Sequence, residues 1–232
     1  EYGIERPFGR DEQPTYAAFC AEAGQVFDLV VQCAYAWRVD GVPDGVPHVG
    51  YGPENHLLDY DLTGFDLFVG GHSWGSGHGN RRFRWFGPAY DEEWHFDGGG
   101  ERPVDVAMVG SLTRPRARLC NVLAENGFSV ITAEGLVWGA YNAVYNLAKM
   151  ALVVTAAGDL TQRVCENTMQ GCLVLMEGVV PDAVRFGLVD GEHYLGFGGD
   201  ASLLEAAERG LSAELREGVV RRAKEIVGPR TW

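Results

Sequence analysis

The chain has 232 residues, a formal charge of −13 from 19 basic and 32 acidic residues, and 46% apolar residues. Such a charge argues against nucleic acid or an anionic membrane as a partner, because both need a basic surface. No apolar run reaches the roughly 20 residues that span a bilayer, and the first residues lack the basic start and apolar core of a signal peptide. We therefore expect a cytoplasmic globular protein without a membrane span.

Cysteine usage agrees with a reducing compartment. The five cysteines are an odd number, contain no C-x-x-C pair and lie mostly in apolar runs. Buried free thiols fit this pattern better than a disulfide framework does.

Short apolar strands separated by polar or glycine-rich loops dominate the first hundred residues. A helix is predicted over residues 16–24, because apolar residues recur there at helical spacing and Gly24 ends the pattern. The strands are apolar on both faces, which is typical of a parallel sheet covered by helices. We predict them over residues 26–32, 45–51 and 64–70, with a short edge strand and turn over 82–90.

Two loops that follow these strands carry candidate catalytic residues. Ligands of open parallel sheets bind beyond the carboxyl ends of the strands. Glu54, Asn55 and His56 follow the second predicted strand, and His72 follows the third. A histidine has a pKa suited to deprotonating an acceptor hydroxyl, so Glu54, His56 and His72 are our candidates for acid–base chemistry. Loop residues with satisfied hydrogen bonds give the same pattern.

Two further patterns in this half are reminiscent of metal sites. His72 and His78 are six positions apart in a glycine-rich loop, and Asp59-Tyr60-Asp61 is a D-x-D string. The histidine pair alone is not specific for a metal, and the acidic string reads as a solvated loop. We expect no bound metal ion.

A second series of strands and helices follows a glycine-rich, charged segment. Residues 97–103 read DGGGERP, a composition typical of a linker. We therefore predict a lobe over residues 1–98, a linker over 99–103 and a lobe over 104–232. Predicted strands after the linker cover residues 104–110, 128–132, 150–155, 172–176 and 192–197, and predicted helices cover 116–126, 141–148, 163–170, 201–209 and 212–227.

This order of elements predicts an α/β protein of two Rossmann-like lobes with a cleft between them. The first lobe has about 100 residues and three clear strands, so it is short or incomplete for a lobe of this kind. The second lobe is the more complete.

The stretch from Asp159 to Leu175 concentrates polar residues between two predicted strands. Arg163 and Glu166 are three positions apart in a predicted helix, so they share one face. Thr161 precedes that helix, where free N–H groups favour a phosphate. A ligand with a phosphate and a ribose suits this pattern. An exposed ion pair and simple capping by Thr161 are the alternatives.

Three motifs of the second half are similar to a known family. They are VDVAMVGS over residues 104–111, YNLAKMALVV over 145–154 and LTQRVCENTMQGCLVLME over 160–177. They resemble GT-B-fold glycosyltransferases, and most of all the CgeB-like group, or glycosyl transferases group 1. In the first half GVPHVGYGPENH and FGPAYDEEWHF resemble the same family more loosely.

The longest motif is similar to the family signature R-x-F-E-A-x-A-x-G-x-x-x-L. Arg163, Glu166 and Gly171 fall on its fixed positions. Cys165 stands where an aromatic residue is usual, and Asn167 stands where alanine is usual.

The resemblance implies a glycosyltransferase of the hexosyltransferase type, which moves a sugar from a nucleotide diphosphate sugar to an acceptor. Glu166 would accept hydrogen bonds from the ribose diol, and Arg163 would neutralise the diphosphate leaving group near Thr161. The nucleotide sugar is a substrate, so no cofactor is expected. The acceptor, whether small molecule, glycan or protein, is left open.

Further donor contacts are expected at the ends of two other strands. Gly110 and Ser111 end the first strand of the second lobe, where glycine lets backbone approach a ligand. Trp138, Tyr141 and Asn142 follow the next strand and are placed either to contact the base or to pack in the core. We include Tyr141 among the donor-binding residues.

Two alternative functions stay open. A non-catalytic or degenerate relative that binds a nucleotide or a protein partner would carry the same motifs. A different Rossmann-type enzyme, such as an epimerase or a dehydrogenase, is disfavoured because no G-x-G-x-x-G follows a strand at a helix start. Gly75-Ser76-Gly77-His78-Gly79 lacks that spacing.

Overall fold

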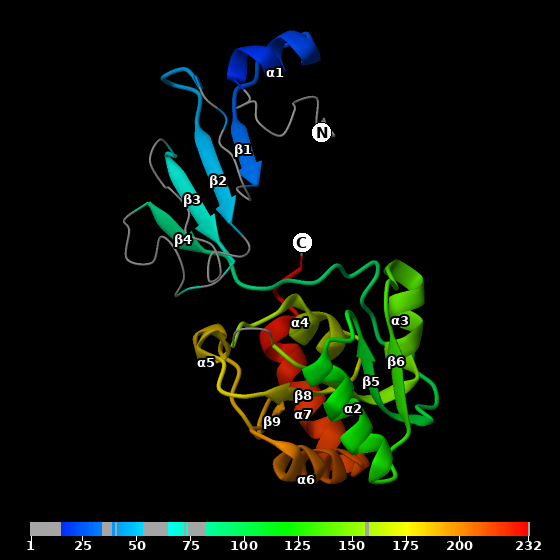
Figure 1. Cartoon of the computed structure of the whole chain (residues 1–232). Coiled ribbons are helices and arrows are strands. Elements are labelled where there is room, and N and C mark those ends of the chain that lie inside the picture. The colour runs from blue at the N-terminus through cyan, green and yellow to red at the C-terminus, as the bar shows by residue number, and fades with distance from the viewer. Residues whose placement is uncertain are drawn as a thin grey trace. The chain divides into compact units, whose positions relative to one another are not determined.

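The chain forms two compact α/β units. The structure is a computed structural model that describes residues 15–33, 39, 41–52, 65–71, 73, 82–155 and 158–231. One unit ends at Phe86 and the other begins at Gly87 (Figure 1). Each contains one sheet of parallel strands, which confirms the predicted α/β class.

In the first unit the described residues form a four-stranded sheet in the order β1-β2-β3-β4. Its core is a small cluster in which Phe65 and Phe68 are buried and Phe83 packs against them. Gly50 lies under this cluster, because a Cβ there would be 2.7 Å from the Phe68 ring. The elements are α1 (Tyr16–Ala23), β1 (Val30–Cys33), β2 (His48–Gly52), β3 (Leu67–Gly70) and β4 (Phe83–Trp85).

The helix and the four strands predicted for this unit are present, but the strands are shorter. The first strand begins at Val30 rather than at residue 26. The reason is that the Tyr16 hydroxyl binds the backbone of Phe27 on both sides, donating to its carbonyl at 2.7 Å and accepting from its N–H at 3.1 Å. The backbone at Phe27 is thereby tied to α1 instead of to a neighbouring strand.

The second unit is a five-stranded sheet in the order β6-β5-β7-β8-β9. Its strands are β5 (Val104–Val109), β6 (Val130–Ala133), β7 (Ala148–Val153), β8 (Leu173–Glu177) and β9 (Leu195–Phe197). Its helices are α2 (Arg114–Glu125), α3 (Trp138–Asn146), α4 (Gln162–Met169), α5 (Pro181–Phe186), α6 (Asp200–Gly210) and α7 (Ala213–Val227).

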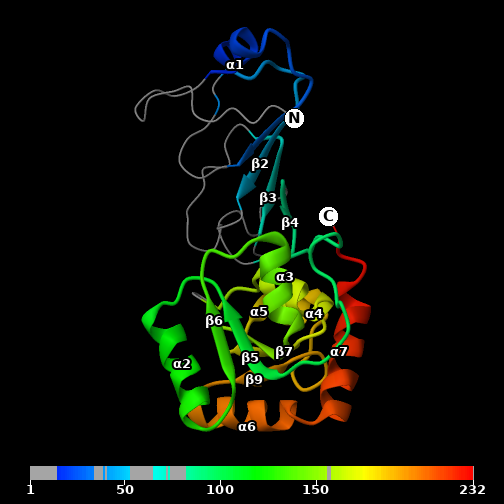
Figure 2. The ribbon, with the colours of Figure 1, turned by 90° about the vertical axis from the view of Figure 1, so that its right-hand side faces the viewer.

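Helices cover both faces of this sheet, as the near-continuous apolar strands predict. Leu119, Leu203 and Val219 of α2, α6 and α7 pack with Met150 and Leu173 of the sheet in one cluster. Tyr141 and Tyr145 of α3 belong to a second cluster, which includes Ala107 and Val109 of β5 and Ala148 and Ala151 of β7. Each fully buried side chain of this size contributes about 1.5–3 kcal/mol. In both views α3 and α4 lie at the upper end of the unit and α6 at its lower end (Figure 2).

The second unit contains one helix that was not predicted, and several of its element boundaries differ from the predictions. The helix α5 was not predicted, because its six residues are too short to show a period. The helix α3 begins at Trp138 rather than at residue 141. Ala148, predicted as the end of that helix, is the first residue of β7, with only Leu147 between them. Among the described residues no helix is both long and apolar enough to cross a membrane.

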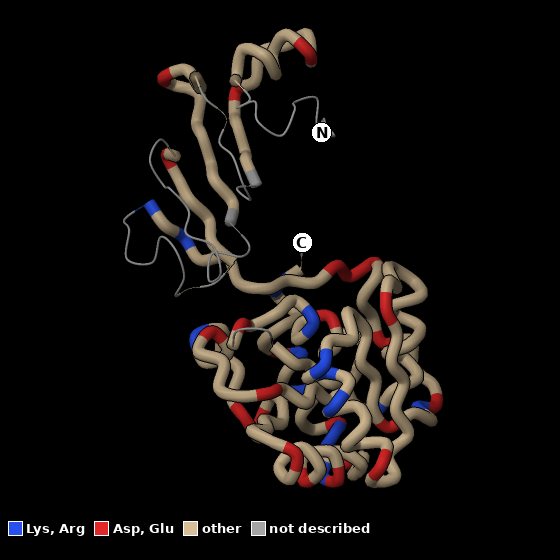
Figure 3. The backbone as a smooth tube through the Cα atoms, in the orientation of Figure 1, with Lys and Arg blue, Asp and Glu red and all other residues tan. Residues whose placement is uncertain are grey.

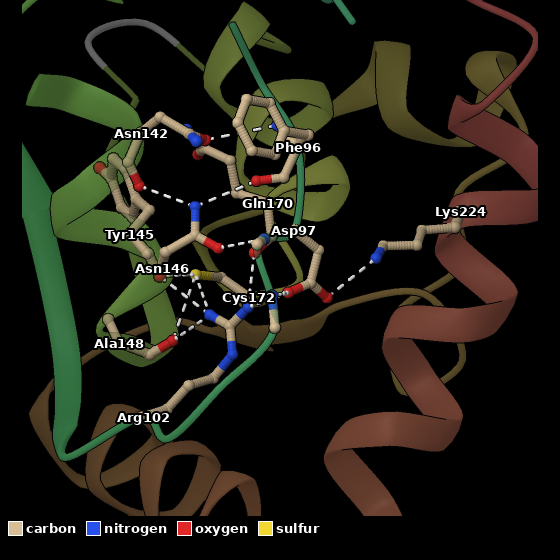
Figure 4. A network of polar contacts seen from close by, with 12 residues as sticks. Phe96, Asp97, Arg102, Asn142, Tyr145, Asn146, Ala148, Gln170, Cys172 and Lys224 are labelled. Carbon is tan, nitrogen blue, oxygen red and sulfur yellow. Dashed lines mark hydrogen bonds and ion pairs between the residues drawn. The ribbon is translucent and has the colours of Figure 1, made fainter. Parts of the chain in front are cut away.

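The glycine-rich segment is fastened to the second unit (Figure 4). Arg102 donates to the carbonyls of Tyr145, Ala148 and Gln170 at 2.9, 2.7 and 2.7 Å, and to Asp97 at 2.8 Å. Lys224 of α7 lies 3.2 Å from the other oxygen of Asp97. Burial alone would raise the pKa of Asp97, but the Gly99 N–H and these two cations outweigh it and hold that pKa below its ordinary value.

Candidate functional site

The strand order of the second sheet predicts where a ligand binds. β6 lies on one side of β5 and β7 lies on the other, so the chain changes direction at β5. Open α/β sheets bind their ligands beyond the carboxyl ends of the strands at such a switch point. Gly110 and Ser111 follow β5 there, and Val154 follows β7.

Arg116 bridges the two loops at this point. It lies in the first turn of α2, whose start contains Pro115, a residue suited to a helix beginning. Its guanidinium donates to the Ser111 carbonyl and to the Val154 carbonyl, both at 3.0 Å. The loops after β5 and β7 are therefore joined by one cationic side chain.

Arg163 lies against the end of β5. A Cβ built on Gly110 would be 2.5 Å from its Nη2 and 3.0 Å from its Cζ, so only glycine leaves room for this guanidinium. Among the described residues the Arg163 guanidinium has no hydrogen bond and no ion pair. The alternative of an Arg163–Glu166 salt bridge does not occur. This partly exposed cation is open to an anionic ligand.

Arg163 is close enough to Arg116 to disfavour the charge of Arg116. Burial lowers the pKa of Arg116, and the positive charge of Arg163 lowers it further, while Asp159 acts in the opposite sense. In Figure 3, blue positions lie on α2 and α4 in the middle of the unit. A bound anion would relieve this repulsion, which is an electrostatic reason for anion binding at this place.

The start of α4 adds backbone donors beside the arginines. Thr161 has an extended backbone at the N-cap, but its hydroxyl does not cap the helix. This buried hydroxyl oxygen finds no hydrogen-bond partner in the part of the chain that the structure describes. Because the Thr161 hydroxyl does not occupy the N–H groups at the start of α4, this N-terminus remains available to an oxyanion.

Glu166 lies one turn after Arg163 on the same helix. Its side chain is 17% exposed, so a ligand can reach it. The Tyr141 hydroxyl donates to its Oε2 at 2.8 Å, and Nε2 of His95 lies 3.8 Å from its Oε1. Burial and the negative charge of Glu166 both raise the pKa of Tyr141, so its hydroxyl keeps its proton and remains a donor.

The aromatic residues of α3 have different surroundings. Tyr141 and Asn142 are buried, and Tyr141 contacts Glu166 rather than facing solvent. Trp138 is 61% exposed and has a φ of 53°, which is strained for a bulky residue. Its ring lies 5.3 Å from that of Trp94. Of the two expectations for these residues, core packing applies to Tyr141 and Asn142 and not to Trp138.

The structure brings most of the predicted donor-binding residues together. Gly110, Ser111, Thr161 and Arg163 meet around the carboxyl ends of β5 and β7, and Glu166 and Tyr141 touch each other nearby. The predicted catalytic residues Glu54, His56 and His72 lie outside the described residues.

Two residues of this site were not predicted. Arg116 belongs to a basic run with Arg114 and Arg118, and its position three residues into a helix that follows a strand and a glycine was a usable signal. The sequence around His95 does not indicate that it approaches Glu166, because this contact depends on how residues 91–98 pack against α3.

Comparison with known proteins identifies the fold. No protein-family model and no curated protein matches this sequence. Among solved structures, a glycosyltransferase from Rickettsia africae ESF-5 is 9% identical, with a TM-score of 0.65 over 92% of this chain and 74% of its own. The sucrose-phosphate synthase from Thermosynechococcus elongatus is 12% identical, with a TM-score of 0.62 over 94% of this chain and 72% of its own.

A third match is a mutant of S. aureus TarM in complex with fondaparinux, alpha-GlcNAc-glycerol and UDP. It is 10% identical, with a TM-score of 0.61 over 82% of this chain, which spans 49% of the TarM chain. At such identities the similarity shows the fold. The predicted GT-B-like fold is confirmed, and membership of the CgeB-like group stays a prediction.

Proposed function

We propose that this protein is a glycosyltransferase that moves a sugar, of the hexose type, from a nucleotide diphosphate sugar to an acceptor. One observation carries the proposal. An arginine that has no hydrogen bond or ion pair within the described residues lies at the switch point of the sheet, one helical turn before a reachable carboxylate. A nucleoside diphosphate carries an anionic diphosphate that suits the arginine and a ribose diol that suits the carboxylate.

The diphosphate would lie against Arg163, Arg116 and the start of α4. Arg163 and the α4 N–H groups would contact its oxygens directly. Arg116 is held by two carbonyls, so it would add charge from a fixed position. As the sugar leaves, negative charge grows on the diphosphate, and preorganised cations stabilise it. Most of the catalytic effect would come from this stabilisation and from positioning.

The ribose would lie at Glu166. A carboxylate has several lone pairs, so it accepts from both hydroxyls of the diol while Tyr141 still donates to Oε2. The exposed ring of Trp138 would offer a face to the base. We keep Glu54, His56 and His72 as candidates for activating the acceptor, whose chemical class is open.

Nucleotide binding and turnover together test the proposal. UDP, GDP, ADP and dTDP, and their sugars, are screened by thermal shift and then by calorimetry. We expect at least one to raise the Tm, Glu166→Ala to lose most of this shift, and Glu208→Gln, an exposed glutamate of α6, to retain it. Release of nucleoside diphosphate from the sugar donor is then measured.

The outcomes separate the alternatives. Stabilisation by none of the nucleotides would contradict the proposal. Stabilisation without turnover, tested with small glycosides, glycans and peptides as acceptors, would support the non-catalytic nucleotide-binding relative instead. Alanine variants of Glu54, His56 and His72 should lower turnover while leaving nucleotide affinity unchanged.

A further inference from the structure

We propose that His95 is a positioning residue that orients the Glu166 carboxylate for the ribose diol. This inference rests on the proposed function, because it gives a second contact to the carboxylate that would hold the ribose. Nε2 of His95 lies 3.8 Å from Oε1, and the Tyr141 hydroxyl donates to Oε2 at 2.8 Å. The two oxygens of one carboxylate are thus approached by two different side chains.

The backbone of Asp91 determines which nitrogen of His95 carries the proton. Nδ1 lies 3.1 Å from both the N–H and the carbonyl of Asp91. That carbonyl already accepts from the N–H groups of Trp94 and His95, at 3.2 and 2.8 Å, whereas the Asp91 N–H needs an acceptor. We therefore assign Nδ1 as the acceptor, which leaves the hydrogen on Nε2, pointing toward Glu166.

The His95 ring is held in place by its surroundings. It packs edge-on against the Tyr141 ring, with centroids 5.8 Å apart and an interplanar angle of 89°. The turn that carries it is closed by the Asp91 carboxylate, which accepts from the Glu93 N–H at 2.9 Å. Only 15% of the His95 side chain is exposed. Such a ring keeps its donor in one direction.

The segment after His95 is fastened to α3, the helix that also supplies Tyr141. Asn146 donates to the Phe96 carbonyl at 3.0 Å and accepts from the Gly98 N–H at 2.7 Å. The Asn142 amide meets the same segment, accepting from the Phe96 N–H at 3.3 Å in one orientation and donating to the Trp94 carbonyl at 3.2 Å in the other. Figure 4 shows the Asn142 and Asn146 contacts with Phe96 from close by.

The physical benefit is preorganisation. A free glutamate side chain samples several rotamers, and holding it in one costs a ligand part of its binding free energy. Tyr141 holds Oε2 by a hydrogen bond before the ligand arrives, and the nearby Nε2–H of His95 attracts Oε1 toward the same orientation. The carboxylate keeps lone pairs for the diol. The distance of 3.8 Å between His95 Nε2 and Glu166 Oε1 is longer than a hydrogen bond, and contacts of this kind tighten when the ligand is bound.

Two conservative variants separate this role from a structural one. The amide of asparagine overlies Nδ1 of histidine, so His95→Asn keeps an acceptor for Asp91 but loses the donor to Glu166. The amide of glutamine overlies Nε2, so His95→Gln keeps the donor and loses the acceptor. The full chain is titrated with UDP, GDP and ADP and with their 2′,3′-dideoxy counterparts, by calorimetry.

We expect His95→Asn to weaken binding of the ribonucleotide about fivefold and to leave the dideoxy nucleotide unchanged, while His95→Gln retains the wild-type preference. Tyr141→Phe should behave like His95→Asn, and neither change should matter in a Glu166→Gln background. If His95→Asn leaves nucleotide affinity unchanged while His95→Gln weakens it, then His95 only stabilises the turn through Asp91, and the inference is wrong. Equal losses for both nucleotides would also overturn it. If wild-type protein binds no nucleotide, the proposed function itself fails, which is a different result.

Discussion

The guanidinium of Arg163 lies directly on Gly110, so close that a Cβ at this glycine would be 2.5 Å from Nη2. Gly110 also has a φ of 135°, a backbone angle that residues other than glycine rarely adopt. Glycine is therefore required at position 110 for two reasons: the backbone conformation there, and the space that the Arg163 guanidinium occupies.

Replacing Gly110 by alanine should displace Arg163. We expect Gly110→Ala to weaken nucleotide binding by roughly tenfold or more, as loss of a charge-assisted contact does. Gly127→Ala is the matched control, because Gly127 also has a positive φ, of 90°, but has nothing within 4 Å of its Cβ position. Both variants should lose about 1 kcal/mol of folding free energy from strain. If calorimetry gives equal nucleotide affinities for Gly110→Ala and Gly127→Ala, the role assigned to the contact between Gly110 and Arg163 is wrong.

Arg163 itself should be expendable for folding. Because it repels Arg116 and makes no ion pair among the described residues, Arg163→Gln should leave the Tm of the ligand-free protein unchanged or raise it. Nucleotide affinity should fall, and its dependence on salt should become weaker. Arg118→Gln on α2 is the control, since Arg118 pairs with Asp200 at the surface. A Tm several degrees lower for Arg163→Gln would identify Arg163 as a structural partner.

Arg102, in contrast to Arg163, should be important for the stability of the fold. It donates to three carbonyls and to Asp97 while only 13% of its side chain is exposed. Arg102→Gln leaves these acceptors unpaired, so we expect a loss of roughly 3 kcal/mol in the free energy of unfolding. Chemical denaturation measures it, with the exposed Arg114→Gln as control. A change below about 0.5 kcal/mol, ordinary for a surface substitution, would refute the assigned role.

Asp97 should make folding sensitive to acid. Its pKa is lowered in the folded protein, so the ionised form stabilises the fold at neutral pH. That contribution is complete above the ordinary aspartate pKa of about 4 and is lost as the pH falls through the lower folded value. Asp97→Asn should therefore be less stable than wild type at pH 7, and the difference should shrink toward pH 3. A difference that stays constant with pH would exclude this linkage. Glu208→Gln, at an exposed position, is the control.

Several parts of the site follow from the order of residues alone. Helical geometry places residues three apart on one face, so Arg163 and Glu166 share a face wherever α4 lies. The alternation of apolar strands with helices predicts parallel sheets, and parallel sheets bind ligands at their carboxyl ends. The sequence alone therefore predicts that Gly110 and Thr161 lie at the same edge of the second sheet, where its strands end.

Other parts depend on tertiary packing. Arg116 reaches the candidate site because it spans the carbonyls of Ser111 and Val154, which only the sheet brings side by side. His95 precedes a segment, residues 97–103, that reads as a linker. Yet Asn146 of α3 accepts from the Gly98 N–H, and Arg102 donates to the carbonyls of Tyr145 and Gln170. The pattern of residues along the sequence predicts helices, strands and the order in which they follow one another, since these depend on residues that are close in the chain. It cannot report which distant side chain faces Glu166, because that is decided by how α3 and residues 91–98 pack together.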